Sequence, residues 1–402
     1  MSRRSRHPWR WLVLTAVVAL VVTVQLTRGV PPPSVRTVAV AAETAASSDP
    51  PRLPWPATGQ GALAVPARGL LVQSGPETPV PIASLTKIMT AYLVLRDHPL
   101  TPAAAGPGVT LDADDQNEAA ADAGADATSV PVQVGEVLSE RQLLNGLLVH
   151  SANNFADVLA KWDSGTVAAF VARMNATAER LGMGHTHYAD ANGLSPASTS
   201  TAADQLRVAQ AAMAIPTFAT VVSQTSITLP IAGVIPNYVT SIGTDGIVGV
   251  KSGFTQAAMG CLVMAADRTV DGHSVLVMAA VTGQTGLVPL DAANAADVSL
   301  VDAAAAVLHD GRVLADDTPA ATVVTAWRRG GVPAVTTRAV TLLTWPGDHV
   351  RFSFAAAPVA LGARAGVVAG TLAVSDGVQH VAVPVRTTAP VTGPTLWWKL
   401  HR

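Results

Sequence analysis

The chain has 402 residues, which is more than one ordinary compact domain holds, so we expect two or three folded units. Hydrophobic residues make up 49% of it and charged residues only 13%, a balance that excludes a disordered chain and allows a sizeable core. The formal net charge of -2 leaves no basic excess to attract phosphate groups, so no nucleic-acid partner is expected.

Residues 1–30 are predicted to be a signal sequence or a signal anchor. The basic residues that flank the apolar stretch 11–26 are Arg3, Arg4, Arg6, Arg10 and Arg28. The stretch is slightly shorter than the roughly 20 residues of a comfortable transmembrane helix. The nearest small-x-small cleavage pattern, at 39–41, lies well beyond it, which favours a retained anchor. Everything after the stretch then faces outward.

Residues 31–58 are rich in Pro, Ala and Ser and show no apolar period, so we expect an extended tether there. Folded structure is predicted to begin at Gly59. Apolar pieces at 62–65 and 70–72 are separated by a turn with Pro and Gly and indicate a β-hairpin. Residues 84–95 contain no Gly or Pro and are apolar nearly all round, which predicts a buried helix.

Residues 59–315 are predicted to form the main domain, with helices in its middle. Ser139 and Gln142 have the spacing of a capping box and open an apolar helix that ends near His150. Further helices are expected at 154–162, 167–181, 201–213 and 292–308, and apolar strands at 261–265 and 275–281. Helices flanked by strands predict an α/β or α+β sheet domain.

A small all-β domain is predicted over residues 316–402, because short β-patterned runs alternate there with Gly, Asp and Pro. These runs lie at 337–344, 349–354, 366–374 and 378–385. The chain then ends in an amphipathic tip that contains Trp397 and Trp398. The two indoles suit a membrane interface and suit equally a cap on the core of the β domain, so both interpretations stay open.

Lysine is scarce in this chain, with four lysines among 26 basic residues. Two of the four, Lys87 and Lys251, stand in apolar or Gly-rich surroundings, where an amine with a tunable pKa can do what a guanidinium cannot. Ser84 and Lys87 are spaced i, i+3, so they share one face of a helix and the amine can reach the hydroxyl. Burial lowers the pKa of such an amine, which would let a neutral Lys87 take the seryl proton near pH 7.

Two more short motifs follow along the chain. Ser151 and Asn153 lie between two apolar helices, where a break can expose a hydroxyl and an amide to a cleft, although the same residue types also serve as helix caps. Lys251, Ser252 and Gly253 enter an apolar strand, where glycine allows close approach of a substrate. Each of these motifs is a weak signal by itself.

Taken together, Ser-x-x-Lys, Ser-x-Asn and Lys-Ser-Gly, in that order on helix, loop and strand, resemble the active-site set of the penicillin-binding fold. The chain is similar to low-molecular-weight penicillin-binding proteins, specifically the D-alanyl-D-alanine carboxypeptidases, over about residues 59–310. The likeness extends to residues 192–194 and 249–255. The family usually has Lys-Thr-Gly as its third motif, and here Ser252 replaces the threonine while keeping the hydroxyl.

The resemblance implies a β-lactamase-like transpeptidase domain of α/β (α+β) type with a helical subdomain, followed by a small all-β domain. It implies a serine peptidase of peptidoglycan synthesis that removes the terminal D-alanine from stem pentapeptides and is inhibited by β-lactams. Ser84 would be the acylated nucleophile and Lys87 its base. The expected partners are the stem peptide, β-lactam antibiotics and, through the N-terminal segment, the membrane of the cell envelope. Neither a metal nor a cofactor is expected.

The resemblance also implies roles for the other motif residues. Ser151 would relay a proton to the leaving amine, and Asn153 would position the base and the substrate amide. Lys251 and Ser252 would grip the terminal carboxylate. The oxyanion would sit between the backbone N–H of the nucleophile and that of Phe254, which follows Gly253. The balance between carboxypeptidase and endopeptidase action stays open.

Two rival functions are compatible with the same motifs. A serine β-lactamase of the best-known class adds a glutamate after Ser-x-Asn to activate the deacylating water. The last glutamate of this chain is Glu179, in a helical run beside Arg180, so slow turnover of penicillin is expected instead. A non-catalytic scaffold that binds peptidoglycan through the β domain is the other rival, and the intact motifs argue against it.

Three weaker candidates lie outside the motif set. Cys261, the one cysteine, stands in an apolar run and is expected to be a small buried hydrophobe. His185, His187 and Asp190 have the residue types of metal ligands, but no fourth ligand has matching spacing. His150 directly precedes the Ser-x-Asn motif, and adjacent side chains diverge, so we expect a helix-end histidine rather than a Ser-His pair.

Overall fold

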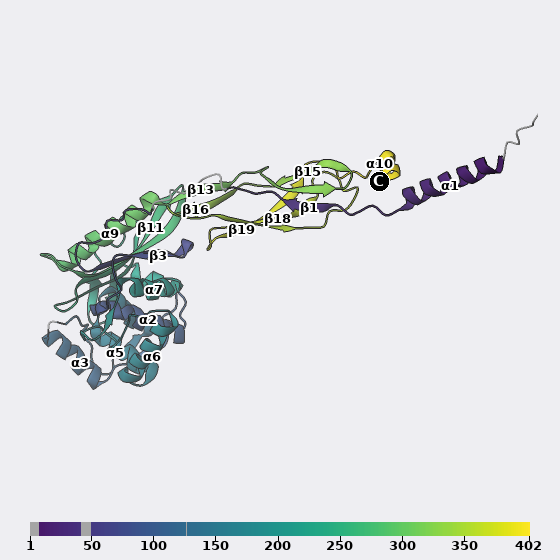
Figure 1. Ribbon diagram of the computed structural model, residues 1–402. Coiled ribbons are helices and arrows are strands. Elements are labelled where there is room, and N and C mark those ends of the chain that lie inside the picture. Colours follow the sequence, from purple (N-terminus) through teal and green to yellow (C-terminus); the bar gives the residue numbers. More distant parts are fainter. Residues whose placement is uncertain (1–7, 42–49, 126) are drawn as a thin grey trace, which may run out of the picture. The chain divides into compact units, whose positions relative to one another are not determined.

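The computed structural model describes residues 8–41, 50–125 and 127–402 and divides the chain into two compact units (Figure 1). One unit is Pro51–His309, and the other joins Met1–Pro50 to Asp310–Arg402. The sequence placed this division at 315/316 and assigned residues 31–58 to a tether. Predicted features that lie outside the described residues are Arg3, Arg4, Arg6 and positions 42–49 of the tether.

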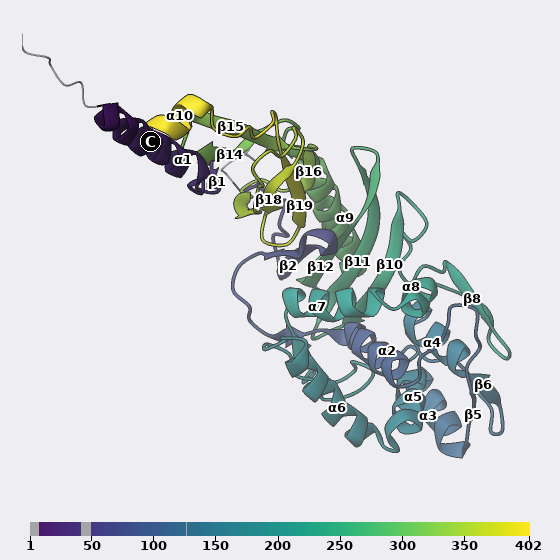
Figure 2. The same cartoon turned by 90° about the vertical axis from the view of Figure 1, so that its right-hand side faces the viewer.

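A five-stranded antiparallel sheet forms the centre of the larger unit. Its strands, in spatial order, are β10 (Ile247–Thr255), β11 (Met259–Val270), β12 (His273–Gln284), β2 (Gln60–Val65) and β3 (Leu70–Gln73). The long helix α9 (Pro289–Val307) packs on β11 and β12 from one face, and α7 (Ala202–Met213) packs on the sheet from the other (Figure 2). Apolar residues of β11 and β12 are therefore buried on both faces, which explains their nearly continuous hydrophobic runs.

Helices beside α7 build the helical subdomain that the sequence predicted. They are α2 (Thr86–Asp97), α3 (Ala113–Gly124), α4 (Glu140–Val149), α5 (Asn153–Ser164), α6 (Val167–Arg180) and α8 (Pro216–Val222). Two short pairs of strands flank them: β5 (Gly108–Thr110) with β6 (Val137–Ser139), and β8 (Ser226–Leu229) with β9 (Gly233–Pro236). A third pair, β4 (Val80–Pro81) with β7 (Thr199–Ser200), ties the loop before α2 to the loop before α7.

Most predicted elements of this unit exist, with small shifts at their ends. The capping box of α4 is present: the Ser139 hydroxyl accepts from the Gln142 backbone N–H, and the Gln142 side chain accepts from the Ser139 N–H. The helix expected at 84–95 begins as a 3-10 turn, Ala83–Leu85, and becomes α-helical only at Thr86. Helices α3 and α8 were not predicted.

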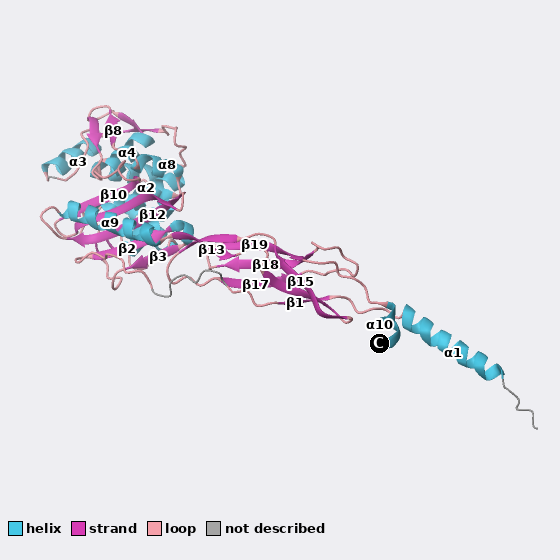
Figure 3. Ribbon diagram, turned by 90° about the horizontal axis from the view of Figure 1, so that it is seen from above, coloured by secondary structure: helices cyan, strands magenta, loops and turns pink. Residues whose placement is uncertain are grey.

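The smaller unit is built on a six-stranded antiparallel sheet, and strands dominate it (Figure 3). The spatial order is β1 (Ser34–Thr37), β14 (Pro319–Thr325), β15 (Arg328–Thr336), β19 (His380–Thr387), β18 (Val368–Ser375) and β17 (Arg351–Ala356). A separate pair joins β13 (His309–Leu314) to β16 (Val340–Thr344). The fold is thus a mixed α and β domain with a helical subdomain and an all-β domain, as predicted.

The prediction of an extended tether outside the folded body is wrong at Ser34–Thr37, because these residues are extended but form edge strand β1 and pair with β14. The N-terminal segment is therefore part of the β sheet formed by the far end of the chain. Two helices belong to the same unit: α1 (Pro8–Thr27) and the short α10 (Leu396–His401). They contact each other, and Arg402 donates hydrogen bonds to backbone carbonyls at the end of α1.

Candidate active site

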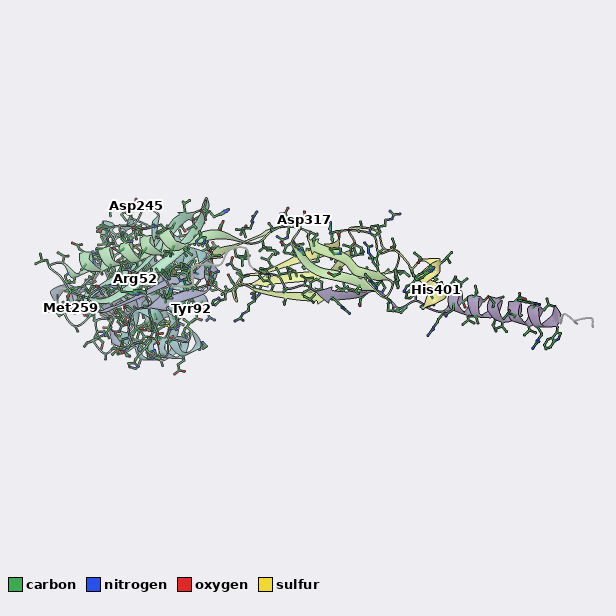
Figure 4. The ribbon with its side chains drawn as sticks, turned by 45° about the horizontal axis from the view of Figure 1, so that its top comes forward. Arg52, Tyr92, Asp245, Met259, Asp317 and His401 are labelled. Carbon is green, nitrogen blue, oxygen red and sulfur yellow. The ribbon has the colours of Figure 1, made fainter. Side chains whose placement is uncertain are left out.

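Ser84 lies on a strained turn at the start of α2. It is the middle residue of the 3-10 turn Ala83–Leu85, and Ala83 has a φ of 47°, which is unfavourable for any residue with a Cβ. Within the described residues, five more non-glycine residues have a positive φ, among them Asp245, Met259 and Asp317, labelled in Figure 4. The turn leaves Ser84 half-buried, while its neighbours Ala83 and Leu85 are buried.

Two glycines let other segments press against this turn. A Cβ placed on Gly193 would overlap the carbonyl of Ala83, and Gly193 itself has a φ of 85°. A Cβ placed on Gly253 of β10 would lie 2.9 Å from the backbone nitrogen of Ser84. Both positions therefore require glycine, and the loop at 193 and strand β10 meet at the serine.

The Lys87 amine is fully buried and makes three hydrogen bonds. Its Nζ lies 2.9 Å from the Ser84 Oγ, 2.7 Å from the Asn153 Oδ1 and 2.5 Å from the backbone oxygen of Asn192. An ammonium has three donors, so this set uses its full hydrogen-bonding capacity. The predicted contact between Ser84 and Lys87 is present, and Asn153 joins it from another helix.

Burial lowers the pKa of the Lys87 amine from its ordinary value of 10.5 to about 7. Three nearby carboxyl groups, those of Asp190, Asp157 and Asp122, act in the opposite direction and favour the charged form. A substantial neutral fraction is therefore present near pH 7, as a proton acceptor for Ser84 requires.

Ser151 and Asn153 occupy the junction between α4 and α5. Ser151 is buried and has a φ of 65°, so the chain turns sharply there. The neighbouring Asn154 binds the backbone of Val130 through both ends of its amide, and this pins the start of α5. The Ser151 side chain makes no hydrogen bond within the described part of the chain, to Ser84 or to any other residue.

The third motif lies on β10, beside the serine turn. Lys251 is buried, and its amine donates to the backbone oxygen of Ser252 at 2.7 Å. Burial lowers the pKa of this amine well below its ordinary value, and the charge of Lys87 lowers it further. Of the remaining motif residues, Ser252 is buried and Phe254 is half-exposed. The structure therefore brings residues of all three motifs to one place, with Gly253 in contact distance of the Ser84 turn.

One contributor was not predicted: the carbonyl of Asn192, which accepts from Lys87. Asn192 lies in a loop held together by Asp190, whose carboxylate accepts from the backbone N–H of Ser195 and the hydroxyl of Ser198. Residues 192–194 belong to the family likeness seen in the sequence, but a backbone acceptor carries no side-chain signal that would reveal its role.

His150 and Cys261 are structural, as expected. His150 is the C-cap of α4 and stacks on the Tyr238 ring with centroids 5.1 Å apart, and burial lowers the pKa of its imidazole. Cys261 is buried in β11, and burial raises the pKa of its thiol to about 12. A thiol with such a pKa is not a nucleophile at neutral pH.

Two of the three residues considered as metal ligands, His187 and Asp190, have other roles. His187 pairs with Thr199 through its backbone, and Asp190 organises its own loop. His185 lies instead near Glu77 and Asp204, close enough for three ligand atoms to share an ion. Arg207 already binds the Asp204 carboxylate at 2.5 Å and approaches Glu77, so its guanidinium supplies the positive charge there.

Comparison with known proteins identifies related chains. The family model described as D-alanyl-D-alanine carboxypeptidase matches residues 67–283. A D-alanyl-D-alanine endopeptidase of Pseudomonas aeruginosa is 34% identical over 208 residues, which are 48% of this chain and 62% of that protein. A D-alanyl-D-alanine carboxypeptidase of Streptomyces sp. (strain K15) is 35% identical over 202 residues, 46% of this chain and 67% of the relative. The chain thus spans about two thirds of the length of these relatives.

Solved structures show the same fold. The Streptomyces K15 DD-transpeptidase covers 63% of this chain and 98% of its own, with a TM-score of 0.56 and 27% sequence identity. The D-alanyl-D-alanine carboxypeptidase DacD from Francisella tularensis covers 88% of this chain and 97% of its own, with a TM-score of 0.59. At 19% identity, the second match supports the fold alone.

Proposed function

The chain belongs to the D-alanyl-D-alanine carboxypeptidase family, since the model of that family matches more than half of it, and from this premise we propose that it is a serine DD-carboxypeptidase of the cell envelope. Its substrate is the stem pentapeptide of peptidoglycan, from which it removes the terminal D-alanine. The observation that carries the proposal is the buried Lys87 amine 2.9 Å from the Ser84 hydroxyl.

Acylation begins when the Ser84 Oγ attacks the carbonyl carbon between the two D-alanines. Its proton passes to the neutral Lys87 amine, and the carbonyl becomes an oxyanion. Backbone N–H groups of Ser84 and Phe254 bind that oxyanion and contribute a few kcal/mol of transition-state stabilisation. The approach of β10 to the serine turn at Gly253 supports this arrangement.

Collapse of the intermediate breaks the peptide bond and leaves an ester on Ser84. The proton held by Lys87 reaches the leaving amine of D-alanine through the Ser151 hydroxyl, while Asn153 keeps Lys87 in place. Water then attacks the ester and restores the serine.

Recognition of the free carboxylate end is assigned to β10. Lys251 and the Ser252 hydroxyl bind the terminal carboxylate of the substrate, a group that distinguishes a carboxypeptidase substrate from an internal peptide. A bound carboxylate would restore the Lys251 charge, because an anion close by raises the pKa of an amine that burial has lowered.

Membrane attachment through the N-terminal helix is part of the proposal. Within the described chain, α1 is the helix long and apolar enough to cross a membrane, with a mean hydropathy of 1.8 over Trp9–Thr27. Cleavage near Ala41 would remove β1 from its sheet, and Arg402 binds the carbonyls of Gln25, Arg28 and Gly29 at the end of α1. These contacts favour a retained anchor over a cleaved signal.

The test uses the full chain in detergent and a synthetic stem pentapeptide. We expect D-alanine to be released by the native protein and not by Ser84→Ala. A cross-linked dimer of stem peptides, run in parallel, measures endopeptidase action. Release of D-alanine by Ser84→Ala contradicts the assignment, and no release by either protein favours the scaffold. Rapid nitrocefin hydrolysis favours the β-lactamase.

A further inference from the structure

Asp157 is a buried carboxylate close to the proposed base, and none of the three motifs includes it. It lies on α5, four residues after Asn153, so the two side chains project from the same face of the helix. Asp157 is only 6% exposed to solvent. Burying a carboxylate is costly unless something compensates, so its partners indicate its role.

The hydrogen bonds of Asp157 lead to Lys87 in two steps. The Asp157 Oδ2 accepts from the Asn192 side-chain amide at 2.8 Å. The other end of that amide, Oδ1, accepts from the backbone N–H of Leu194 at 2.9 Å. The Asn192 side chain is therefore held at both ends, and its backbone carbonyl accepts from the Lys87 amine at 2.5 Å.

On the basis of the proposed function, we propose that Asp157 is a positioning residue for Lys87, which fixes the Asn192 carbonyl on the amine and places a carboxyl charge behind the site. Helix α5 then holds the base twice, directly through Asn153 and indirectly through Asp157. Because Asp157 reaches the reacting atoms only through other residues, it is not itself catalytic.

The surrounding charges make the protonation states of the two residues depend on each other. Burial raises the pKa of Asp157 to about 7, and the carboxyl of Glu118 on α3 adds to the effect. The Lys87 amine has a pKa of about 7. An ionised Asp157 favours the charged amine, while a protonated Asp157 favours the neutral amine that acylation needs.

The other titratable groups packed around the pair also act on it. Asp122 on α3 and Asp190 in the Asn192 loop favour the charged form of Lys87. Lys161 on α5 binds Asp115 and Glu118, which offsets part of the negative charge of α3. Lys251 lies on β10, and burial and the charge of Lys87 both lower the pKa of its amine. Asp157 differs from all of these in its hydrogen bond to Asn192.

The decisive variant is Asp157→Asn, which keeps an oxygen to accept from Asn192 and removes the charge. The rate of acylation by a fluorescent penicillin is measured against pH with the full chain in detergent. We expect the rising limb of the profile, which follows loss of the Lys87 proton, to move about half to one unit toward lower pH. A purely structural carboxylate predicts no shift.

The companion variant Asp157→Ala removes the acceptor as well as the charge. The Asn192 carbonyl loses its support, so we expect acylation to slow about tenfold or more throughout the profile. The matched control is Asp163→Asn on the same helix, where a buried carboxylate pairs with Arg173 away from the site. We expect it to lower the melting temperature and to leave the pH profile in place.

The inference is overturned if Asp157→Asn keeps the native pH limb, and this result decides the matter even where Asp157→Ala does not fold. Native rates in Asp157→Ala overturn the positioning role. Neither result touches the proposed function, which fails separately if Ser84→Ala still binds penicillin covalently.

Discussion

Burial gives the Lys87 amine a lower pKa than that of an exposed lysine. Its amine has no exposure to solvent, and each of its protons has an acceptor. The cost of burying the charge appears as a pKa of about 7, which gives the residue a neutral fraction when it faces Ser84. The same physics acts on Lys251, where a second buried amine stands close to the first.

The sequence predicted the side-chain part of this site and not its backbone part. Ser84 and Lys87 could be paired from their helical spacing, and Asn153 from the order of the motifs. The Asn192 carbonyl could not be found this way, because every residue carries a carbonyl and only the fold selects one. Asp157 has a local signal, its i, i+4 spacing from Asn153, but the loop that it holds is distant in sequence.

A second buried carboxylate, Asp297, provides a test of stability. It lies on α9 with no exposure, and neither of its oxygens has a hydrogen-bond partner within the described residues. Burial raises its pKa well above the ordinary 3.8. Between these two pKa values the folded protein binds more protons than the unfolded chain, so this group makes stability fall as pH rises.

Asp297→Asn removes that titration. We expect the melting temperature of the variant, minus that of the native protein, to increase as the pH rises from about 5 to about 8. Lys87 and Lys251 have the opposite effect, because their lowered pKa values make stability rise with pH. Both proteins contain these lysines, so their effect cancels in the difference. The control is Asp302→Asn, exposed on the same helix. A difference that stays constant with pH contradicts the prediction.

Among the secondary-structure elements, a helix with an apolar stripe was predicted, whereas helix α3, which has a capping box but no such stripe, and strand β1, which has a distant partner, were not. Helix α4 carries its own capping box and an apolar stripe. Helix α3 is rich in Ala and acidic residues and has few apolar side chains to reveal its buried face. Strand β1 has four residues in a Pro-rich segment, and its partner β14 lies almost 300 positions away, so no local pattern specifies it.

The contact between β10 and the turn before α2 is the element-scale feature on which the site depends. Gly253→Ala would put a Cβ 2.9 Å from the Ser84 nitrogen and 3.2 Å from the Ile82 oxygen, and backbone atoms cannot move away cheaply. We expect acylation by a fluorescent penicillin to slow about tenfold or more with a smaller change in melting temperature.

Gly184→Ala is the matched control, because a Cβ at that exposed position meets nothing within 4 Å. Acylation of this variant should match the native protein. If Gly253→Ala is acylated at the native rate, β10 can move away from the turn without loss of activity, and the close packing of the two segments is not required.

In the whole molecule, described residues before Pro50 share one unit with the C-terminal part of the chain. Strand β1 completes the sheet of the β domain, and the C-terminal Arg402 binds the end of α1. The two tryptophans of the C-terminal tip have different surroundings, one packed on the β domain and one exposed. Trp398 packs edge-on against Trp327 with centroids 5.6 Å apart, whereas Trp397 is 69% exposed beside the exposed Leu396.

Trp397 is therefore expected to lie in the membrane interface when α1 crosses the bilayer, since its exposed indole is on α10, which contacts α1, and an indole suits that region. Lipids brominated near the headgroup should quench the tryptophan fluorescence of the reconstituted full chain, and Trp397→Ala should reduce the quenched fraction. Trp162→Phe on α5 serves as the control. Equal quenching in Trp397→Ala and native protein contradicts this placement.

The proposed function depends on acylation of Ser84 and on transfer of the Ser84 proton to Lys87. Intact-mass and peptide-mapping mass spectrometry after brief incubation with benzylpenicillin tests it most directly. We expect one covalent adduct located on Ser84, and a large loss of that adduct in Lys87→Arg, because a guanidinium stays charged and cannot accept the proton. An adduct on another residue, or undiminished labelling of Lys87→Arg, would contradict it.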